Sequence, residues 1–190
     1  PPDVNRATRL ARIDTVTGRA EVIASISGIA ENVSVRGMAI APPAGCTGGG
    51  SNFAGLVFPF IREKLAGRMS PTIRAVEPTS CPSLTRGVYA YDFGDASGMT
   101  PLLKMYTLGA DFVPDAVHAG GLRFHGMAPL VSAAYDQDLL DAVAIKQRDA
   151  FAAGVLFSRA EGIIPASESN HAIAGALGHL RAAENDGEGQ

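Results

Sequence analysis

The sequence predicts an α/β protein, a three-layer sandwich built on a mainly parallel sheet. Strand-like and helix-like segments alternate between residues 44 and 182, which is typical of helices that cover both faces of such a sheet. Hydrophobic residues make up 46% of the 190 residues and charged residues 18%, so the chain can bury a core. A run of three glycines, residues 48–50, separates an expected strand from an expected helix.

The expected elements are short and follow one another closely. Residues 21–29 read as a strand or a short helix. A helix over residues 52–65 should place Leu56, Phe60 and Lys64 on one face, and Pro59 should kink or shorten it. The next expected elements are a strand at 72–76, a long loop at 77–100, a helical turn at 102–105, a helix at 126–135 and a strand at 139–145.

Two further helices are expected towards the end of the chain. The first covers residues 147–160 and should place Phe151, Val155 and Ser158 on one face. It should end at Gly162, because glycine is favoured just past a helix C-terminus. The second follows a serine cap at Ser167 or Ser169. Its shared face is expected to hold Ile173, Leu177 and Leu180. Three regions result: residues 1–43, poorly organised; residues 44–182, the main domain; and residues 183–190, a polar tail expected to fray.

Composition narrows the class of protein. The formal net charge is −3, which gives no reason to expect a nucleic-acid partner. No apolar stretch approaches the length of a membrane span, and no secretory signal pattern opens the sequence, so we expect no membrane association and a cytoplasmic protein. The two cysteines, Cys46 and Cys81, are too few for a disulfide framework or a cysteine zinc site, and no histidine pair adds a ligand set. We therefore expect reduced thiols and no metal centre.

The glycine run is the main functional signal. Gly48, Gly49, Gly50, Ser51 and Asn52 stand at an expected strand-to-helix junction. Glycine lets an anion approach the backbone amides closely, and the start of a helix adds partial positive charge. Neither a Walker loop nor the usual dinucleotide fingerprint is present. From these five residues alone, a phosphate site and a flexible glycine turn remain equally open.

Other candidate residues have ordinary structural explanations. Glu77, Asp92 and Asp95 could act as acid and base, although carboxylates in a solvated loop are the simpler reading. Glu168 reads as a local cap or bridge. The alternation of Tyr89, Tyr91 and Phe93 is typical of one face of a strand that packs on the core.

Six blocks of sequence stand out between residues 44 and 182. They are CTGGGSNFAG (46–55), AVEP (75–78), SLTRGVYAYDFGD (83–95), TPLLKMYTLGADF (100–112), HAGGLRFHGMAPLVS (118–132) and EGIIPASESNHAI (161–173). In their order and spacing these blocks resemble the tryptophan synthase beta chain family. The stretches TRGVY, PLLKM and HAGGLRFHG are similar to its second, standalone subgroup rather than to the subgroup that pairs with an alpha subunit.

The resemblance implies a pyridoxal-phosphate enzyme of fold type II that forms L-tryptophan from L-serine and indole. Residues 48–52 would then hold the phosphate of pyridoxal phosphate. Glu161 would be the glutamate beside the cofactor ring, and Asp95 the aspartate that engages the substrate hydroxyl. The family further implies a homodimer and a monovalent cation, and leaves the alpha subunit open.

The chain also departs from that family. The family's cofactor-binding lysine lies in a His-Lys pair that is missing here, and Lys64, Lys104 and Lys146 stand where the family has no such lysine. The family's Ser-Gly segment that faces the pyridine nitrogen is missing too, and residues 1–43 do not match. We therefore expect a C-terminal-half fragment that is inactive alone. A truncated gene, a disrupted reading frame and a fused segment remain open as explanations, and so does a non-catalytic phosphate-binding module. Chemistry of the cysteine or threonine synthase type is disfavoured, because those relatives have a different sequence in the region that corresponds to residues 87–126.

Overall fold

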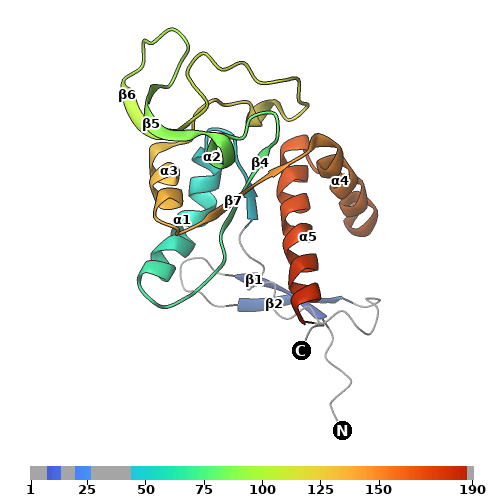
Figure 1. Cartoon of the computed structure of the whole chain (residues 1–190). Coiled ribbons are helices and arrows are strands. Elements are labelled where there is room, and N and C mark those ends of the chain that lie inside the picture. The colour runs from blue at the N-terminus through green and yellow to red at the C-terminus, as the bar shows by residue number, and fades with distance from the viewer. Residues whose placement is uncertain (1–7, 14–19, 27–43, 188–190) are drawn as a thin grey trace. The chain divides into compact units, whose positions relative to one another are not determined.

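The computed structural model describes the backbone of residues 8–13, 20–26 and 44–187 and the side chains of residues 44–179 (Figure 1). The chain divides into two compact units, Pro1–Ala41 and Pro42–Gln190. In the first, β1 (Thr8–Ile13) and β2 (Ala20–Ile26) pair antiparallel, with an irregularity between Leu10 and Ala11. The expected strand at 21–29 is therefore confirmed as far as residue 26, and residues 27–29 lie outside the described part.

The second unit is built on a parallel sheet in the order β3–β4–β7, which confirms the predicted α/β class. A separate antiparallel pair, β5–β6, follows the central strand in the sequence. In chain order the elements are β3 (Ala44–Cys46), α1 (Ser51–Leu65), β4 (Arg74–Pro78), α2 (Ser83–Arg86), β5 (Val88–Phe93), β6 (Leu102–Thr107), a 3-10 turn η1 (Gly120–Leu122), α3 (Pro129–Asp136), β7 (Asp141–Ile145), α4 (Gln147–Glu161) and α5 (Ser167–Gly187).

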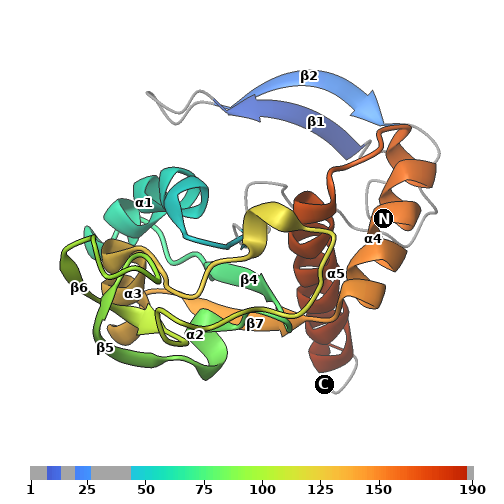
Figure 2. The same cartoon turned by 90° about the horizontal axis from the view of Figure 1, so that it is seen from above.

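The parallel sheet is the middle of three layers. Helices α1 and α3 lie on one side of it, and α5, backed by α4, lies on the other (Figures 1 and 2). The central strand serves both layers because successive side chains of a strand point to opposite faces. Ala75 joins the core formed with α1 and α3, whereas Val76 faces α5 at Gly175.

The helix α5 approaches the sheet closely because it presents glycine there. A Cβ placed on Gly175 would lie 2.5 Å from Cγ2 of Val76. On its other side α5 packs against α4, where a Cβ on Gly154 would lie 2.2 Å from Oδ1 of Asn170. Small residues therefore set the spacing of this layer on both sides of α5.

The predicted faces of two helices are wrong. Helix α1 buries Phe53, Val57 and Ile61, while Leu56 is 47% exposed and Phe60 and Lys64 are half-buried. Apolar residues occur on several sides of this helix, and contact with the sheet selects the face that is buried. Pro59 does not shorten the helix, because the carbonyl left without its amide belongs to exposed Gly55, which water can reach.

Helix α4 departs from its predicted face in the same way. Its buried side holds Ala150, Ala153 and Gly154, and the larger Phe151 and Val155 are exposed. Close packing against α5 selects small side chains, so the bulkiest residues are turned outwards. Gly162, with φ at 70°, ends the helix as predicted.

The middle and the end of the chain contain the other differences. Residues 102–105 are strand, not a helical turn, since β6 gains its hydrogen bonds from β5. The long loop at 77–100 contains α2 and β5, and β5 is the strand that the Tyr89, Tyr91 and Phe93 alternation predicts. Tyr91 is nevertheless 70% exposed, so that face does not pack on the core throughout. The last helix begins at Ser167 and continues to Gly187, into the stretch expected to be a tail.

Candidate functional site

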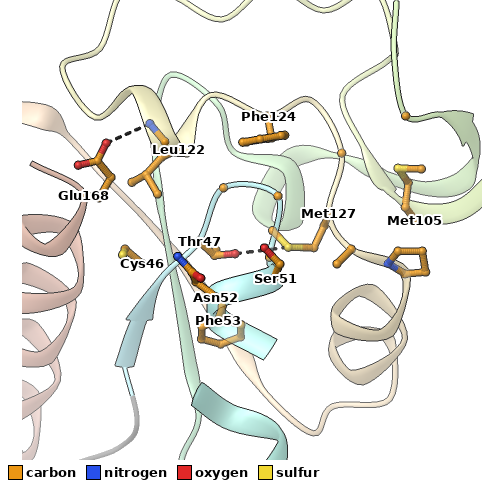
Figure 3. A pocket seen from close by; sticks show the side chains of 18 residues that line it. Cys46, Thr47, Ser51, Asn52, Phe53, Met105, Leu122, Phe124, Met127 and Glu168 are labelled. Carbon is orange, nitrogen blue, oxygen red and sulfur yellow. Dashed lines mark hydrogen bonds between the residues drawn. The ribbon is translucent and has the colours of Figure 1, made fainter. Parts of the chain in front are cut away.

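A cavity of about 430 Å³ lies at the carboxyl ends of β3 and β4, where the glycine run leads into α1 (Figure 3). Its wall comes from four separate parts of the chain. They are residues 46–53, the hairpin residues Gly94 and Met105, residues 121–129 without Arg123 and His125, and Glu168 of α5.

The glycine run forms a tight turn between β3 and α1. Thr47 extends the strand by donating its amide to the carbonyl oxygen of Val76 at 2.8 Å. Gly50 then takes φ at 93°, a left-handed conformation that glycine adopts without strain, and serves as the N-cap of α1. The first helical amide with a backbone partner is that of Ala54, which donates to the carbonyl oxygen of Gly50.

Six consecutive backbone amides, those of residues 48–53, therefore have no hydrogen-bond acceptor within the described part of the chain. They line the cavity at the start of α1, and the first turn of that helix contains no acidic residue. Unpartnered amides at a helix N-terminus attract anions by hydrogen bonding and by the helix dipole. The side chains of Ser51 and Asn52 are exposed beside them and can donate further bonds. The residues present therefore fit a phosphate group.

The glycines are also required by packing on their other side. A Cβ on Gly48 would lie 2.5 Å from the carbonyl oxygen of Gly121, and a Cβ on Gly50 would lie 2.6 Å from the sulfur of Met127. Gly49 is less crowded, since the atoms nearest to its Cβ would be those of the Phe124 ring, at 3.3 to 3.4 Å. Close packing within the protein is thus a second reason for glycine at Gly48 and Gly50, independent of any ligand.

The segment that packs on these glycines, residues 118–128, is named here the covering segment. It is fixed by contacts from several elements. Glu168 accepts the amide of Gly121 at 3.0 Å, Cys81 donates its thiol to the carbonyl oxygen of Phe124 at 2.7 Å, and Ala128 donates its amide to the carbonyl oxygen of Gly49 at 2.9 Å. His125 Nε2 lies 2.8 Å from the carbonyl oxygen of Phe93. The backbone over the glycine run is therefore held in place.

Glu168 is a residue of the cavity to which the sequence analysis gave only a local role, as a cap or bridge. It stands in the first turn of α5 and lines the cavity. The hydrogen bond from the Gly121 amide holds the pKa of its carboxyl below the ordinary range. The signal that could have found it is its position in the sixth matched block, beside a helix start that faces the cavity.

The two predicted catalytic residues are not brought together with the glycine run. Glu161 is exposed at the end of α4 and is not among the residues that line the cavity. Asp95 lies in the turn between β5 and β6, next to the lining residue Gly94. There it accepts bonds from Ser97 Oγ, from the Met99 amide at 3.3 Å, and from the amide and hydroxyl of Thr100 at 3.0 and 2.8 Å. These bonds hold the pKa of Asp95 well below its usual range and show a carboxylate engaged in shaping its own turn.

None of the three lysines of the chain lines the cavity. Lys64 donates to the carbonyl oxygen of Leu139 at 3.0 Å, and Lys104 lies over the ring of Tyr89 at 4.4 Å. Lys146 is exposed at the N-cap of α4. The wall of the cavity, as these residues form it, contains no amine.

Three further titratable groups, Cys46, Cys81 and Glu77, are partly or fully buried. Both cysteines are free, as expected, and burial raises the pKa of Cys46 and raises that of Cys81 to about 11. Glu77 is fully buried and accepts bonds from the amides of Leu84 and Thr85 at 3.0 and 2.8 Å; burial nevertheless raises its pKa. In the described residues, no three His, Cys, Asp or Glu side chains are grouped so that they could hold a metal ion.

A cavity at the carboxyl ends of parallel strands, with a glycine run and open amides at a helix start, is typical of α/β proteins that bind phosphorylated ligands. Residues 37–190 match the protein family described as "Pyridoxal-phosphate dependent enzyme". The chain belongs to this family.

The similar curated proteins are tryptophan synthase beta chains, which confirms the resemblance seen in the sequence. The chain is 60% identical over 133 residues to "Tryptophan synthase beta chain" of Thermosipho africanus, covering 70% of this chain and 31% of that protein. It is 54% identical over 144 residues to "Tryptophan synthase beta chain 2" of Methanothermobacter thermautotrophicus, covering 76% and 34%. The chain thus spans about a third of the length of these relatives.

Among solved structures, a fungal L-serine ammonia-lyase from Rhizomucor miehei is similar with a TM-score of 0.47 and 16% identity, covering 73% of this chain and 39% of that one. None of the helices in the described stretches is both long enough and apolar enough to cross a membrane.

Proposed function

We propose that this chain forms the cofactor-phosphate site of a tryptophan synthase beta-type enzyme, which makes L-tryptophan from L-serine and indole with pyridoxal phosphate. The observation that carries the proposal is the row of six open amides, residues 48–53, at the start of α1 in a cavity. The matched family names the cofactor to which this phosphate would belong, and the high identity to tryptophan synthase beta chains supports the reaction.

In this proposal the residues of the chain bind and orient rather than attack. The amides of residues 48–53, with Ser51 and Asn52, hold the phosphate. Glu168 is the carboxylate that faces the cavity, so it takes the place beside the cofactor that the sequence analysis assigned to Glu161. Bound pyridoxal phosphate would supply the electron sink that β-replacement at an amino acid requires. Asp95 remains a candidate for the substrate hydroxyl only if its turn opens.

The cavity lacks the amine that would hold the cofactor covalently, so we propose that the described chain alone does not catalyse the reaction. The alternative function, a non-catalytic phosphate-binding module, draws on the same observation. A homodimer, a bound monovalent cation, a relationship to an alpha subunit and a cytoplasmic location are proposals that rest on the family resemblance alone.

The test is a titration of the purified chain with pyridoxal phosphate, followed by borohydride reduction and mass spectrometry. We expect reversible binding that is weakened at least about tenfold by the double change Ser51→Ala and Asn52→Ala, because two hydrogen-bond donors to the phosphate are removed. We expect no cofactor fixed to Lys64, Lys104 or Lys146.

The matched control is Ser169→Ala, since Ser169 is an exposed helix serine that does not line the cavity. It should leave binding unchanged. Equal binding by the wild type and the double variant would refute the phosphate site. Covalent attachment to one of the three lysines would instead refute the statement that the chain lacks its amine.

A further inference from the structure

The ring of Phe124 lies directly on the glycine run. A Cβ on Gly48 would be 3.1 Å from Cδ2 of this ring, and a Cβ on Gly49 would be 3.3 to 3.4 Å from its Cδ1, Cε1 and Cγ atoms. The ring therefore occupies the space that a side chain at either position would need, and it lines the same cavity as the open amides (Figure 3).

The backbone that carries this ring is fixed, but the ring itself is not enclosed. The carbonyl of Phe124 accepts the Cys81 thiol, and the Gly121 amide three positions earlier is held by Glu168. The side chain of Phe124 has solvent on its outer side, since the residue is 49% exposed. An aromatic ring at this solvent boundary, next to Gly48 and Gly49, is placed to shield a ligand on the glycine run from bulk water.

We propose that Phe124 is a positioning residue for the phosphate of the bound ligand: its ring covers the glycine run and keeps water and salt ions away from the amide–phosphate hydrogen bonds. The inference rests on the proposed function and adds a residue to it. No sequence pattern pointed to Phe124, because an isolated phenylalanine after a Gly-Gly pair carries no chemistry of its own.

The physical basis is the strength of charge interactions at low dielectric. A phosphate bound to amides that face water is screened by solvent and by ions, whereas one covered by an apolar ring is screened much less. Removing the ring should therefore weaken binding and should also make binding more sensitive to salt. A purely structural role of Phe124 would lower the stability of the protein without changing the salt dependence.

The test uses pyridoxine 5′-phosphate, which has the phosphate but no aldehyde and so reports only non-covalent binding. Its dissociation constant is measured by calorimetry at low and at high NaCl for the wild type, Phe124→Ala and Phe124→Tyr. We expect Phe124→Ala to weaken binding about tenfold at low salt and to show a steeper loss at high salt. Phe124→Tyr keeps the ring and should bind like the wild type.

Tyr91→Ala is the matched control, because it truncates an aromatic side chain that is 70% exposed and does not line the cavity. Phe124→Leu replaces Phe124→Ala if circular dichroism shows that the alanine variant is unfolded. If a folded Phe124→Ala or Phe124→Leu variant has the same affinity and the same salt dependence as the wild type, the proposed role of Phe124 is overturned. The proposed phosphate site still stands in that case if the Ser51→Ala and Asn52→Ala double variant has lost binding. Absence of binding in the wild type overturns the cover together with the proposed function.

Discussion

Two glycines of α5 offer a direct measurement of how tightly this helix is packed on the sheet. Gly175 and Gly178 lie in the same helix, and a Cβ added at Gly178 would meet nothing within 4 Å. A Cβ at Gly175 would lie 2.5, 3.3 and 3.5 Å from Cγ2, Cγ1 and Cβ of Val76, which is fully buried on the central strand. Both changes to alanine gain about 1 kcal/mol of helix propensity. Only Gly175→Ala forces extra volume into a packed core, at a cost of about 1–3 kcal/mol.

Gly178→Ala should therefore stabilise the protein by up to about 1 kcal/mol, and Gly175→Ala should be less stable than Gly178→Ala by about 1–3 kcal/mol. The difference between the two variants isolates the packing term, because the propensity gain is common to both. The assay is urea unfolding followed by circular dichroism at 222 nm, with equal m-values required for the comparison. If Gly175→Ala is as stable as Gly178→Ala, α5 does not pack on Val76 as described.

Three other changes test separate features. Glu77→Ala leaves the buried Leu84 amide without its acceptor and should lower the free energy of unfolding in urea by about 2–5 kcal/mol. Because the pKa of Glu77 is raised, the stability of the wild type should fall as the pH rises through the ionisation of this carboxyl, and Glu77→Gln should lack that fall. Arg74→Met breaks an ion pair in which Arg74 donates two hydrogen bonds to Asp141, at 2.8 and 2.6 Å, and should lower the free energy of unfolding by about 0.5–1 kcal/mol. The loss should be smaller in 1 M NaCl, and a loss that salt does not reduce would argue against an ionic origin. Asp95→Asn should lower the hydrogen-exchange protection factors of the 94–100 turn, that is, the rates corrected for the intrinsic pH dependence of exchange. Since the pKa of Asp95 is lowered, acidifying the wild type below about pH 4 should lower the same protection factors, and unchanged protection in both cases would count against the role of Asp95 in this turn.

Local sequence pattern predicted the elements well and their faces poorly. The glycine run, the helix after it and the stop at Gly162 follow from properties of single residues, and the structure has all three. The buried stripe of α1 does not follow, because Leu56 and Val57 are equally apolar and only the position of the sheet separates them. Residues 102–105 form a strand because they pair with β5, and the pattern of these four residues alone carries no information on that pairing.

The two glutamates of the sixth block show the same limit at the site. Glu161 and Glu168 both lie within one matched segment, and residue type cannot say which of them faces the cavity. The choice depends on the break at Gly162, after which the chain starts α5 with Glu168 beside Gly121. Phe124 was missed for a related reason, since its importance comes only from the glycines beneath it.

The covering segment makes the proposed anion site a property of the whole folded unit. Thr47 and Met127, in contact through the Thr47 hydroxyl and the methionine sulfur, are 80 positions apart in the chain. An unfolded chain cannot hold these parts together without closing a long loop, so a phosphate ligand should bind the native state and not the unfolded one. Such a ligand at 100 times its dissociation constant would add about 2.7 kcal/mol to the free energy of unfolding. Occupancy of the cavity is then coupled to folding, and the chain would be most resistant to proteolysis where the ligand is abundant.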